Sequence, residues 1–144
     1  MNGHENIMNK HFLHNFFALV FLFVLLVGCS KNVPMGGKVT FSDNGEPLTT
    51  GTVVFVSGSQ QAKGYLNERG EYKLGFAKAG DGLPPGRYGV YISGADRSEG
   101  DRDSGTYKLI PLISAKQASL EKSELTIEVD GSKRRYDIVV DRPK

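Results

Sequence analysis

Short segments that alternate apolar and polar residues with a period of two recur along this chain, separated by turns rich in glycine. This period places alternate side chains on opposite faces of a β-strand. About seven strands, with helical propensity only at 114–122, predict an all-β fold: two antiparallel sheets packed face to face. The predicted strands are 38–41, 52–56 (a continuous apolar run), 62–67, 71–76, 88–92, 125–129 and 135–140.

Turn-forming residues lie between these segments. Glycine makes up 18 of the 144 residues, well above its usual share of about 7%. The Asn-Gly pair at 44–45 and Gly70 supply the positive φ angles that tight turns and hairpins need. In the strand after Gly70, the side chains of Tyr72, Leu74 and Phe76 are expected to share one face and enter the core.

The composition beyond residue 28 excludes several kinds of active site. All three histidines precede residue 28, the chain has no tryptophan, and Cys29 is its single cysteine. Nucleophile–histidine systems and Cys/His zinc sites need residues that this segment lacks. We therefore expect no enzyme, no catalytic residue and no cofactor. The formal net charge of +2, without a long run of one sign, argues against nucleic acid as a partner.

The N-terminal segment has the features of an export signal. Residues 16–27 are all apolar, which is shorter than the roughly 20 residues that a helix needs to cross a bilayer. A buried core helix would show a polar stripe, and this run has none. Its length fits the apolar region of a signal peptide, so residues 1–28 are predicted to be a cleaved signal helix.

The end of this segment resembles the lipobox of bacterial lipoprotein precursors. Leu26 is branched, Val27 occupies a tolerant position, and the small Gly28 precedes Cys29. The resemblance implies that the thiol of Cys29 receives a diacylglyceryl group, that cleavage occurs before it, and that the new amine is acylated. A chance cysteine after an ordinary signal is the alternative.

Lipidation of Cys29 would determine where the remaining chain works. One acyl chain holds a protein only marginally on a membrane, whereas two or three hold it durably. We expect residues 29–36 to form a lipidated tether and 37–144 to form the sandwich, anchored to the bacterial cell envelope and facing the periplasm or cell surface. Ser30, in the absence of aspartate, resembles a signal for sorting to the outer membrane. The expected partners are membrane lipid, through acylated Cys29, and an unidentified envelope protein.

Residues 37–140 resemble carboxypeptidase-regulatory-like domains, which are seven-stranded transthyretin-like, Ig-like β-sandwiches. The resemblance rests on segments 37–55, 67–72 (Asn-Glu-Arg-Gly-Glu-Tyr), 81–92 and the closing pair 123–129 and 136–140. It implies a non-catalytic binding or structural module. Transthyretin-like hydroxyisourate hydrolases use histidines and a Tyr-Arg-Gly-Ser tail, whereas this chain ends Asp-Arg-Pro-Lys.

Two tyrosines are candidate ligand contacts. Tyr65 and Tyr91 fall on strand faces opposite the predicted core, where they would stack on a sugar or peptide. This gives the alternative function, a carbohydrate- or small-ligand-binding accessory domain. Tyr72 and Tyr88 are predicted to be structural, each with its ring at the core edge and its hydroxyl bonded to the backbone.

Two charged segments have open interpretations. The polar segment 94–105 contains candidate oxygen ligands for calcium at Asp96, Glu99, Asp101 and Asp103. Two arginines interleave with them and the EF-hand spacing is missing, so a solvated loop is favoured. Residues 133–135 (Lys-Arg-Arg), at a predicted hairpin tip, would contact anionic headgroups or simply solubilise a turn, and the second reading is the default.

Overall fold

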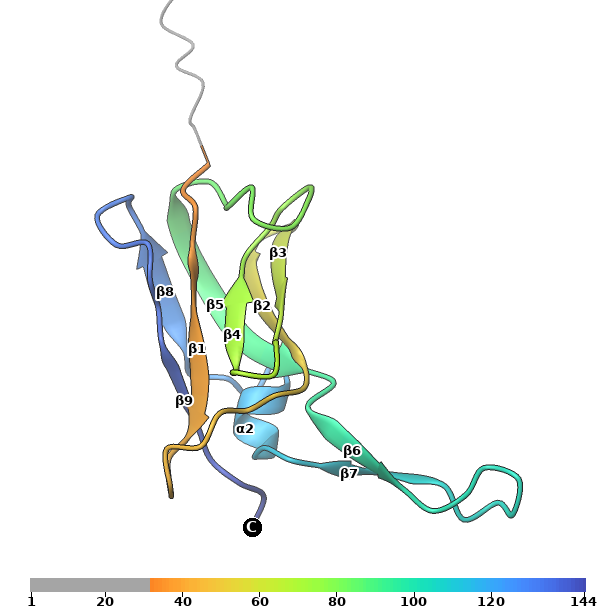
Figure 1. The fold of residues 1–144 in the computed structure, drawn as a ribbon. Helices are drawn as coiled ribbons and strands as arrows, with labels where there is room; N and C mark the ends of the chain where they lie inside the picture. The colour runs from red at the N-terminus through yellow and green to blue at the C-terminus, as the bar shows by residue number, and fades with distance from the viewer. Residues whose placement is uncertain (1–31) are drawn as a thin grey trace, which may run out of the picture. The chain divides into compact units, whose positions relative to one another are not determined.

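Nine strands and one short helix make up residues 32–144, the part of the chain that the computed structural model describes (Figure 1). The predicted signal segment 1–28 and Cys29 lie outside the described residues. The elements are β1 (Gly36–Phe41), β2 (Thr52–Ser57), β3 (Gln60–Tyr65), β4 (Glu71–Lys73), β5 (Gly86–Ser93), β6 (Asp96–Glu99), β7 (Lys108–Pro111), α2 (Ala115–Ala118), β8 (Thr126–Val129) and β9 (Ile138–Val140).

The strands form two main sheets and a separate hairpin. One sheet has the order β4-β1-β9, the second has the order β3-β2-β5-β8, and β6 pairs only with β7. The apolar side chains that alternate along β1, β5, β8 and β9 are buried in one core between the two main sheets. The prediction of an all-β sandwich is confirmed.

Aromatic and aliphatic side chains from both sheets fill this core. The Phe55 and Tyr88 rings lie 6.2 Å apart, tilted by 52°, which is a favourable arrangement for two aromatic rings. Leu48 and Leu74 are almost fully buried in the same cluster. Burying each such side chain stabilises the fold by about 1.5–3 kcal/mol.

Two features of the sheets differ from the prediction. The described residues contain nine strands rather than seven, because the backbone of the polar segment around residue 100 pairs with itself as β6 and β7. The second difference is that β1 and β9 run parallel, with Val39 opposite Ile138 and Phe41 opposite Val140. Every other pair of named strands is antiparallel. The segment before β9 reaches β1 beside Gly36, where β1 starts, so the two strands run the same way.

The two turns predicted as hairpins connect different sheets. The turn at Gly70 leads from β3 to β4, and the 130–135 turn leads from β8 to β9. A turn sequence specifies a reversal of direction but does not specify which sheet the next strand joins. The chain therefore crosses between the layers at both places.

The ordered fold also begins earlier than the predicted boundary at residue 37. Val33 and Met35 are buried, and Val33 exchanges backbone hydrogen bonds of 2.8 and 3.1 Å with Leu83. Phe76, predicted to enter the core with Tyr72 and Leu74, is instead 45% exposed. β4 ends at Lys73, so the strand alternation no longer applies at Phe76.

Candidate functional site

An open groove of about 1150 Å³ crosses the corner of the sandwich where β4 meets β3. Its floor is the start of β1, and its sides are the segment that follows β4, the turn before β4, and the turn before β9. The side chains of Lys63, Tyr65, Lys73, Phe76 and Arg134 are among those that line it. Cations and exposed aromatic rings therefore share one concave surface.

Two glycines at the start of β1 form the floor. Gly36 pairs with Lys73 of β4 on one side and bridges Arg135, in the segment before β9, on the other, so three backbone segments lie side by side there. A Cβ on Gly37 would overlap the backbone carbonyl of Tyr136. The lack of side chains lets the strands approach closely and leaves the groove open between flanking cations.

Asp81 holds one side of the groove in shape. Its carboxylate accepts hydrogen bonds from the backbone N–H groups of Phe76, Ala77 and Lys78, at 2.7, 3.0 and 3.1 Å. Burial alone would raise the pKa of the Asp81 carboxyl, but these hydrogen bonds outweigh it and lower the pKa below its ordinary value. The charged carboxylate thus fixes the loop that presents Phe76 and Lys78.

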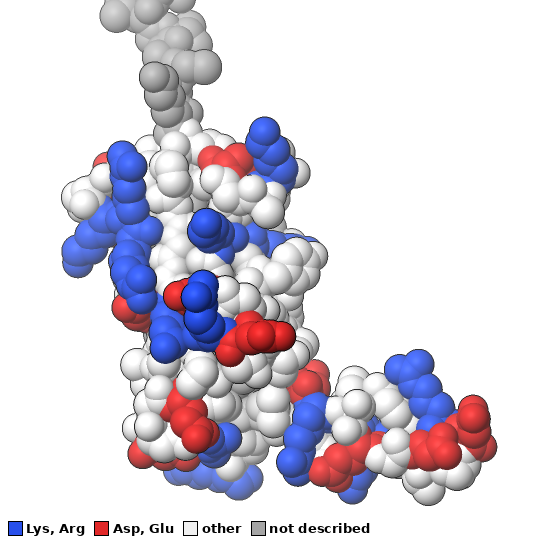
Figure 2. All heavy atoms as spheres, viewed as in Figure 1, with Lys and Arg blue, Asp and Glu red and all other residues white. Residues whose placement is uncertain are grey.

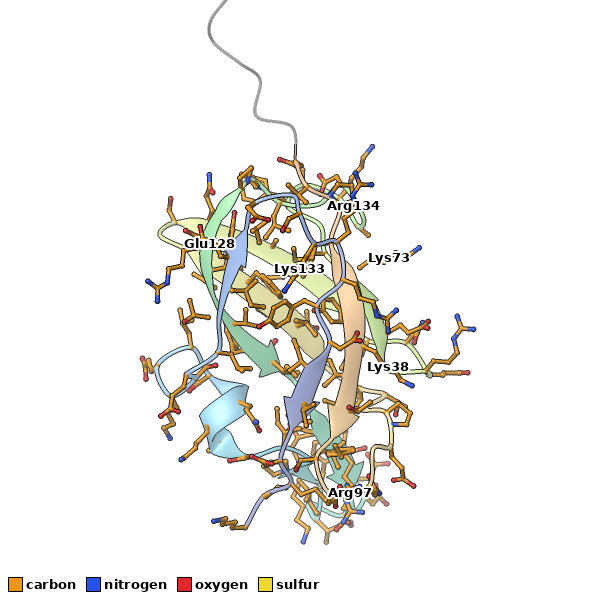
Figure 3. The ribbon with its side chains drawn as sticks, turned by 90° about the vertical axis from the view of Figure 1, so that its left-hand side faces the viewer. Lys38, Lys73, Arg97, Glu128, Lys133 and Arg134 are labelled. Atoms are coloured by element: carbon orange, nitrogen blue, oxygen red, sulfur yellow. The ribbon has the colours of Figure 1, made fainter. Side chains whose placement is uncertain are left out.

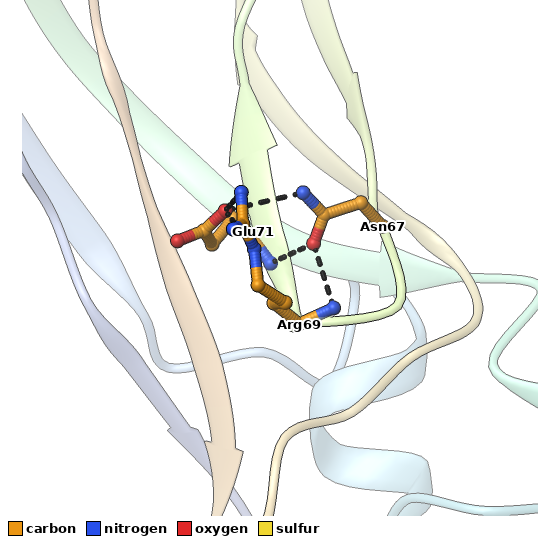
Figure 4. A network of polar contacts seen from close by, with 3 residues as sticks. All are labelled: Asn67, Arg69 and Glu71. Atoms are coloured by element: carbon orange, nitrogen blue, oxygen red, sulfur yellow. Dashed lines mark hydrogen bonds and ion pairs between the residues drawn. The ribbon is translucent and has the colours of Figure 1, made fainter.

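A polar network holds the opposite side of the groove (Figure 4). The Asn67 side-chain oxygen accepts hydrogen bonds from the backbone N–H groups of Arg69 and Glu71, both at 2.9 Å. The Asn67 amide and the Arg69 guanidinium both contact one oxygen of the Glu71 carboxylate, at 3.2 and 3.0 Å. Together they lower the pKa of the Glu71 carboxyl, the Asn67 hydrogen bond most strongly. Glu71 is the single carboxylate among the groove-lining residues, and this network neutralises it.

The groove and its surroundings are electropositive. Figure 2 shows Lys and Arg side chains on both sides of the strip over β1 and β4. Among residues 32–144, four cations here have no ion pair within 4.0 Å: Lys63, Lys73, Lys78 and Arg134. Arg135 instead pairs with Asp137 at 3.0 Å. The groove is therefore suited to an anionic ligand.

The two tyrosines proposed as ligand contacts do not form one site. Tyr65 is 75% exposed and lines the groove. Tyr65 of β3 pairs with Thr52 of β2, and Thr52 pairs with Ser93 of β5. Tyr91 is two residues before Ser93 on β5, so the backbones at Tyr65 and Tyr91 are about 12 Å apart. Tyr91 is half-buried outside the groove, and its hydroxyl accepts a 3.4 Å hydrogen bond from Gln61.

The four acidic residues proposed as calcium ligands lie in β6 and at the tip of its hairpin: Asp96, Glu99, Asp101 and Asp103. The Glu99 carboxylate pairs with Arg97 at 2.7 Å and with Lys108 at 3.9 Å. An Asp101 oxygen accepts a hydrogen bond from the backbone of Asp103. Within the described part of the chain, no three His, Cys, Asp or Glu residues gather as they would around a metal ion. We keep the interpretation of a solvated segment, now formed as a hairpin.

The predicted structural tyrosines have the expected partners. The Tyr72 hydroxyl donates to the carbonyl of Tyr136 at 2.6 Å, and that of Tyr88 donates to the carbonyl of Pro84 at 2.8 Å. Burial, followed by the charge of Asp137, raises the pKa of Tyr72, and burial raises the pKa of Tyr88.

Between residues 32 and 144, no helix has the length and apolar character needed to cross a bilayer.

Comparison with known proteins gives partial structural matches at low sequence identity. No family model matches the chain, and no curated protein matches it. The chain is similar to the major pilin subunit of Bacillus cereus, with 14% identity over 79% of this chain and 30% of that one, at a TM-score of 0.46. It is also similar to a 9R-lipoxygenase from Cyanothece, with 18% identity over 79% of this chain and 16% of that one, at a TM-score of 0.33. This chain spans less than a third of the length of either protein.

Proposed function

We propose that this chain is a lipid-anchored, non-catalytic β-sandwich that binds a partner at the bacterial cell envelope. The observation that carries the proposal is the basic groove with its exposed Tyr65 and Phe76, which is suited to binding. Its lining residues contain one carboxylate and no histidine or cysteine, a set better suited to holding a ligand than to acid–base chemistry. The lipobox-like segment ending at Cys29 supports an extracytoplasmic location, and Ser30 supports the outer membrane.

The transthyretin-like identity is part of this proposal. Two segments that resemble the carboxypeptidase-regulatory-like family have clear structural roles. The 67–72 segment forms the polar network at the start of β4, and the Pro-Pro-Gly sequence leads into β5, where Tyr88 bonds back to Pro84. Both roles are compatible with a module that accompanies other envelope proteins without being catalytic.

The anchor is tested by metabolic labelling with a palmitate analogue. Wild-type protein should be labelled and should sediment with membranes, whereas Cys29→Ala should lose the label and appear in the soluble fraction. Equal labelling of the two proteins would reject lipidation at Cys29 and, with it, the proposed location.

The alternative function is carbohydrate binding, and the 75% exposure of Tyr65 inside the groove favours it. A glycan array with wild-type protein would identify saturable sugar binding. Stacking on Tyr65 predicts that Tyr65→Ala loses binding and that Tyr91→Ala, outside the groove, keeps it. Absence of saturable binding to any glycan would reject this alternative.

A further inference from the structure

We propose that the end of the sandwich where the chain enters it is a membrane-facing surface that binds the headgroups of anionic phospholipids. This inference rests on the proposed function, because it requires the lipid anchor at Cys29. We call this surface the tether end and define it as Val33, the 73–83 segment and the 130–135 turn.

The contacts of Val33 bring the three parts of the tether end together. Its backbone bonds to Leu83 in both directions, and a Cβ on Gly82 would overlap its carbonyl group. A Cβ on Gly131 would lie 3.8 Å from the Val33 side chain. The segment after β4 and the turn before β9 therefore both adjoin the residue at which the chain joins the fold.

The length of the tether limits how far this end can be from the lipid. Cys29 is four residues before Val33, and four residues span at most about 14 Å when extended. Electrostatic screening acts over about 8 Å at physiological ionic strength. A lipidated Cys29 would therefore keep Val33, where the chain joins the fold, within one or two screening lengths of the headgroups.

The charge of the tether end suits an anionic leaflet. Lys73, Lys78, Lys133 and Arg134 are exposed and, among the described residues, have no ion pair within 4.0 Å. Figure 3 shows Lys73, Lys133 and Arg134 in the half of the sandwich where β1 begins, with Arg97 at the opposite end.

The nearby acidic side chains weaken this positive charge only in part. The Asp81 carboxylate bonds to backbone N–H groups of its own loop, and that of Asp130 accepts from the Ser132 backbone. Glu128 is exposed and has no ion pair within 4.0 Å among the described residues. Four cations thus remain without a paired carboxylate, and each cation brought to an anionic leaflet strengthens the contact about fivefold.

An exposed aromatic side chain lies among these cations. Phe76 is 45% exposed on the loop that Asp81 fixes, next to Lys78 in the groove lining. Phenylalanine beside lysine and arginine is typical of protein surfaces that rest at the boundary between headgroups and acyl chains. An acidic polysaccharide would also match the cations, but the anchor supplies the lipid surface at a high effective concentration, which favours the headgroups.

The test uses the full lipoprotein, purified from membranes and reconstituted in two kinds of vesicle, phosphatidylcholine alone or phosphatidylcholine with phosphatidylglycerol. Hydrogen exchange is measured at the backbone amides of 75–83 and 130–135. Exchange should be at least about fivefold slower on the anionic vesicles. The difference should disappear near 1 M salt, where screening acts over about 3 Å.

Two double variants test whether the protection depends on the cations of the tether end or only on the net charge of the protein. The double variant Lys133→Gln/Arg134→Gln should lose the protection. The control Arg97→Gln/Lys108→Gln, in the β6–β7 hairpin, removes the same number of charges and should keep it. Equal loss in both double variants would overturn the inference.

Flotation with the vesicles distinguishes failure of the inference from failure of the anchor. Protein that floats with both vesicles but exchanges equally on them would overturn the inference and leave the proposed function standing. Protein that floats with neither vesicle would reject the anchor, and the inference with it. Protection by soluble polygalacturonate but not by anionic vesicles would overturn the inference and assign the groove to acidic polysaccharide.

Discussion

The hydroxyl of Tyr72, in β4, connects that strand to the segment before β9. It donates a 2.6 Å hydrogen bond to the carbonyl of Tyr136, and its ring is almost fully buried. Tyr72→Phe leaves that carbonyl without this donor and should lower the free energy of unfolding by about 1–2 kcal/mol. Tyr65→Phe, on an exposed side chain, should change it by less than about 0.5 kcal/mol. Urea unfolding of both variants checks this, and equal effects would contradict it.

The raised pKa of Tyr72 also predicts a loss of stability at high pH. Burial favours the neutral hydroxyl in the folded state and places its pKa above the ordinary value of 10.0. This contribution is complete below pH 10 and is lost as the pH rises further, because the unfolded chain ionises first. From neutral pH to above pH 10, the free energy of unfolding should therefore fall less steeply in Tyr72→Phe than in wild type. A residual slope should remain, since burial also raises the pKa of Tyr88.

Gly37 shows why one position in β1 tolerates no side chain. A Cβ there would overlap the Tyr136 carbonyl, which belongs to a backbone and cannot rotate away. Gly37→Ala should destabilise the fold by about 1–3 kcal/mol. In Gly89→Ala the new Cβ would meet the flexible end of the Leu120 side chain, so the cost should be smaller. Thermal unfolding of the two variants gives the comparison, and a larger loss in Gly89→Ala would contradict this account.

Among the elements, the β6–β7 hairpin contributes least to the sandwich. It projects from the body in Figure 1, and residues 100–109 are all exposed. The core residues Ala95 and Ile113 lie outside it, and the Leu112 backbone bonds to Ala95 at 2.8 Å. Its ion pairs are exposed, and such pairs contribute about 0–1 kcal/mol.

Replacing residues 97–110 with a short glycine-containing turn should therefore leave the sandwich folded. Asp96 and Pro111 are partners in register, so a short connection spans the gap. The free energy of unfolding should change by less than about 1 kcal/mol, because the cost of closing a loop depends only weakly on its length. Urea unfolding measures the difference. A loss of several kcal/mol would show that the hairpin supports the core.

Strand positions could be predicted from the sequence because the alternation of apolar and polar residues indicates which face of a strand is buried. Ile127 and Val129 in β8, and Ile138 and Val140 in β9, are buried as their spacing predicts. The pairing of β6 with β7 could not be predicted, since exposed strands need no apolar alternation and polar residues suit them equally. The parallel pairing of β1 with β9 also has no local signal, because it depends on where a distant segment returns.

The groove could be predicted only in part, because its lining residues also come from segments that are distant in the sequence. The alternation around Tyr65 indicates a side chain on the outer face, and that side chain lines the groove. Lys73 and Arg134 are 61 positions apart, and they line the same groove only after β4, β1 and the segment before β9 are assembled. Phe76 was expected in the core, since the sequence does not mark where β4 ends.

At the scale of the whole molecule, the described chain keeps a nearly constant charge around neutral pH. Histidine is the side chain that ordinarily titrates between about pH 5 and 8, and no histidine occurs beyond residue 14. The resolved pKa shifts lower those of carboxyls and raise those of tyrosines and Arg135, so all of them move away from neutrality. The positive charge of the tether end is therefore independent of pH in this range and sensitive to salt.

This constancy predicts that contact with an anionic surface has a flat pH profile. For the lipoprotein on vesicles that contain phosphatidylglycerol, protection of the 130–135 amides, corrected for intrinsic exchange, should be the same at about pH 6 and about pH 8.5. The α-amino group of Cys29 is the one group near the tether end that would titrate there, with an ordinary pKa of about 7.7–8.0 when it is free. Acylation removes that charge. A flat profile therefore indicates an acylated amine as well as a histidine-free surface, whereas a decrease in protection near pH 8 would mean that the amine is free and contributes to binding.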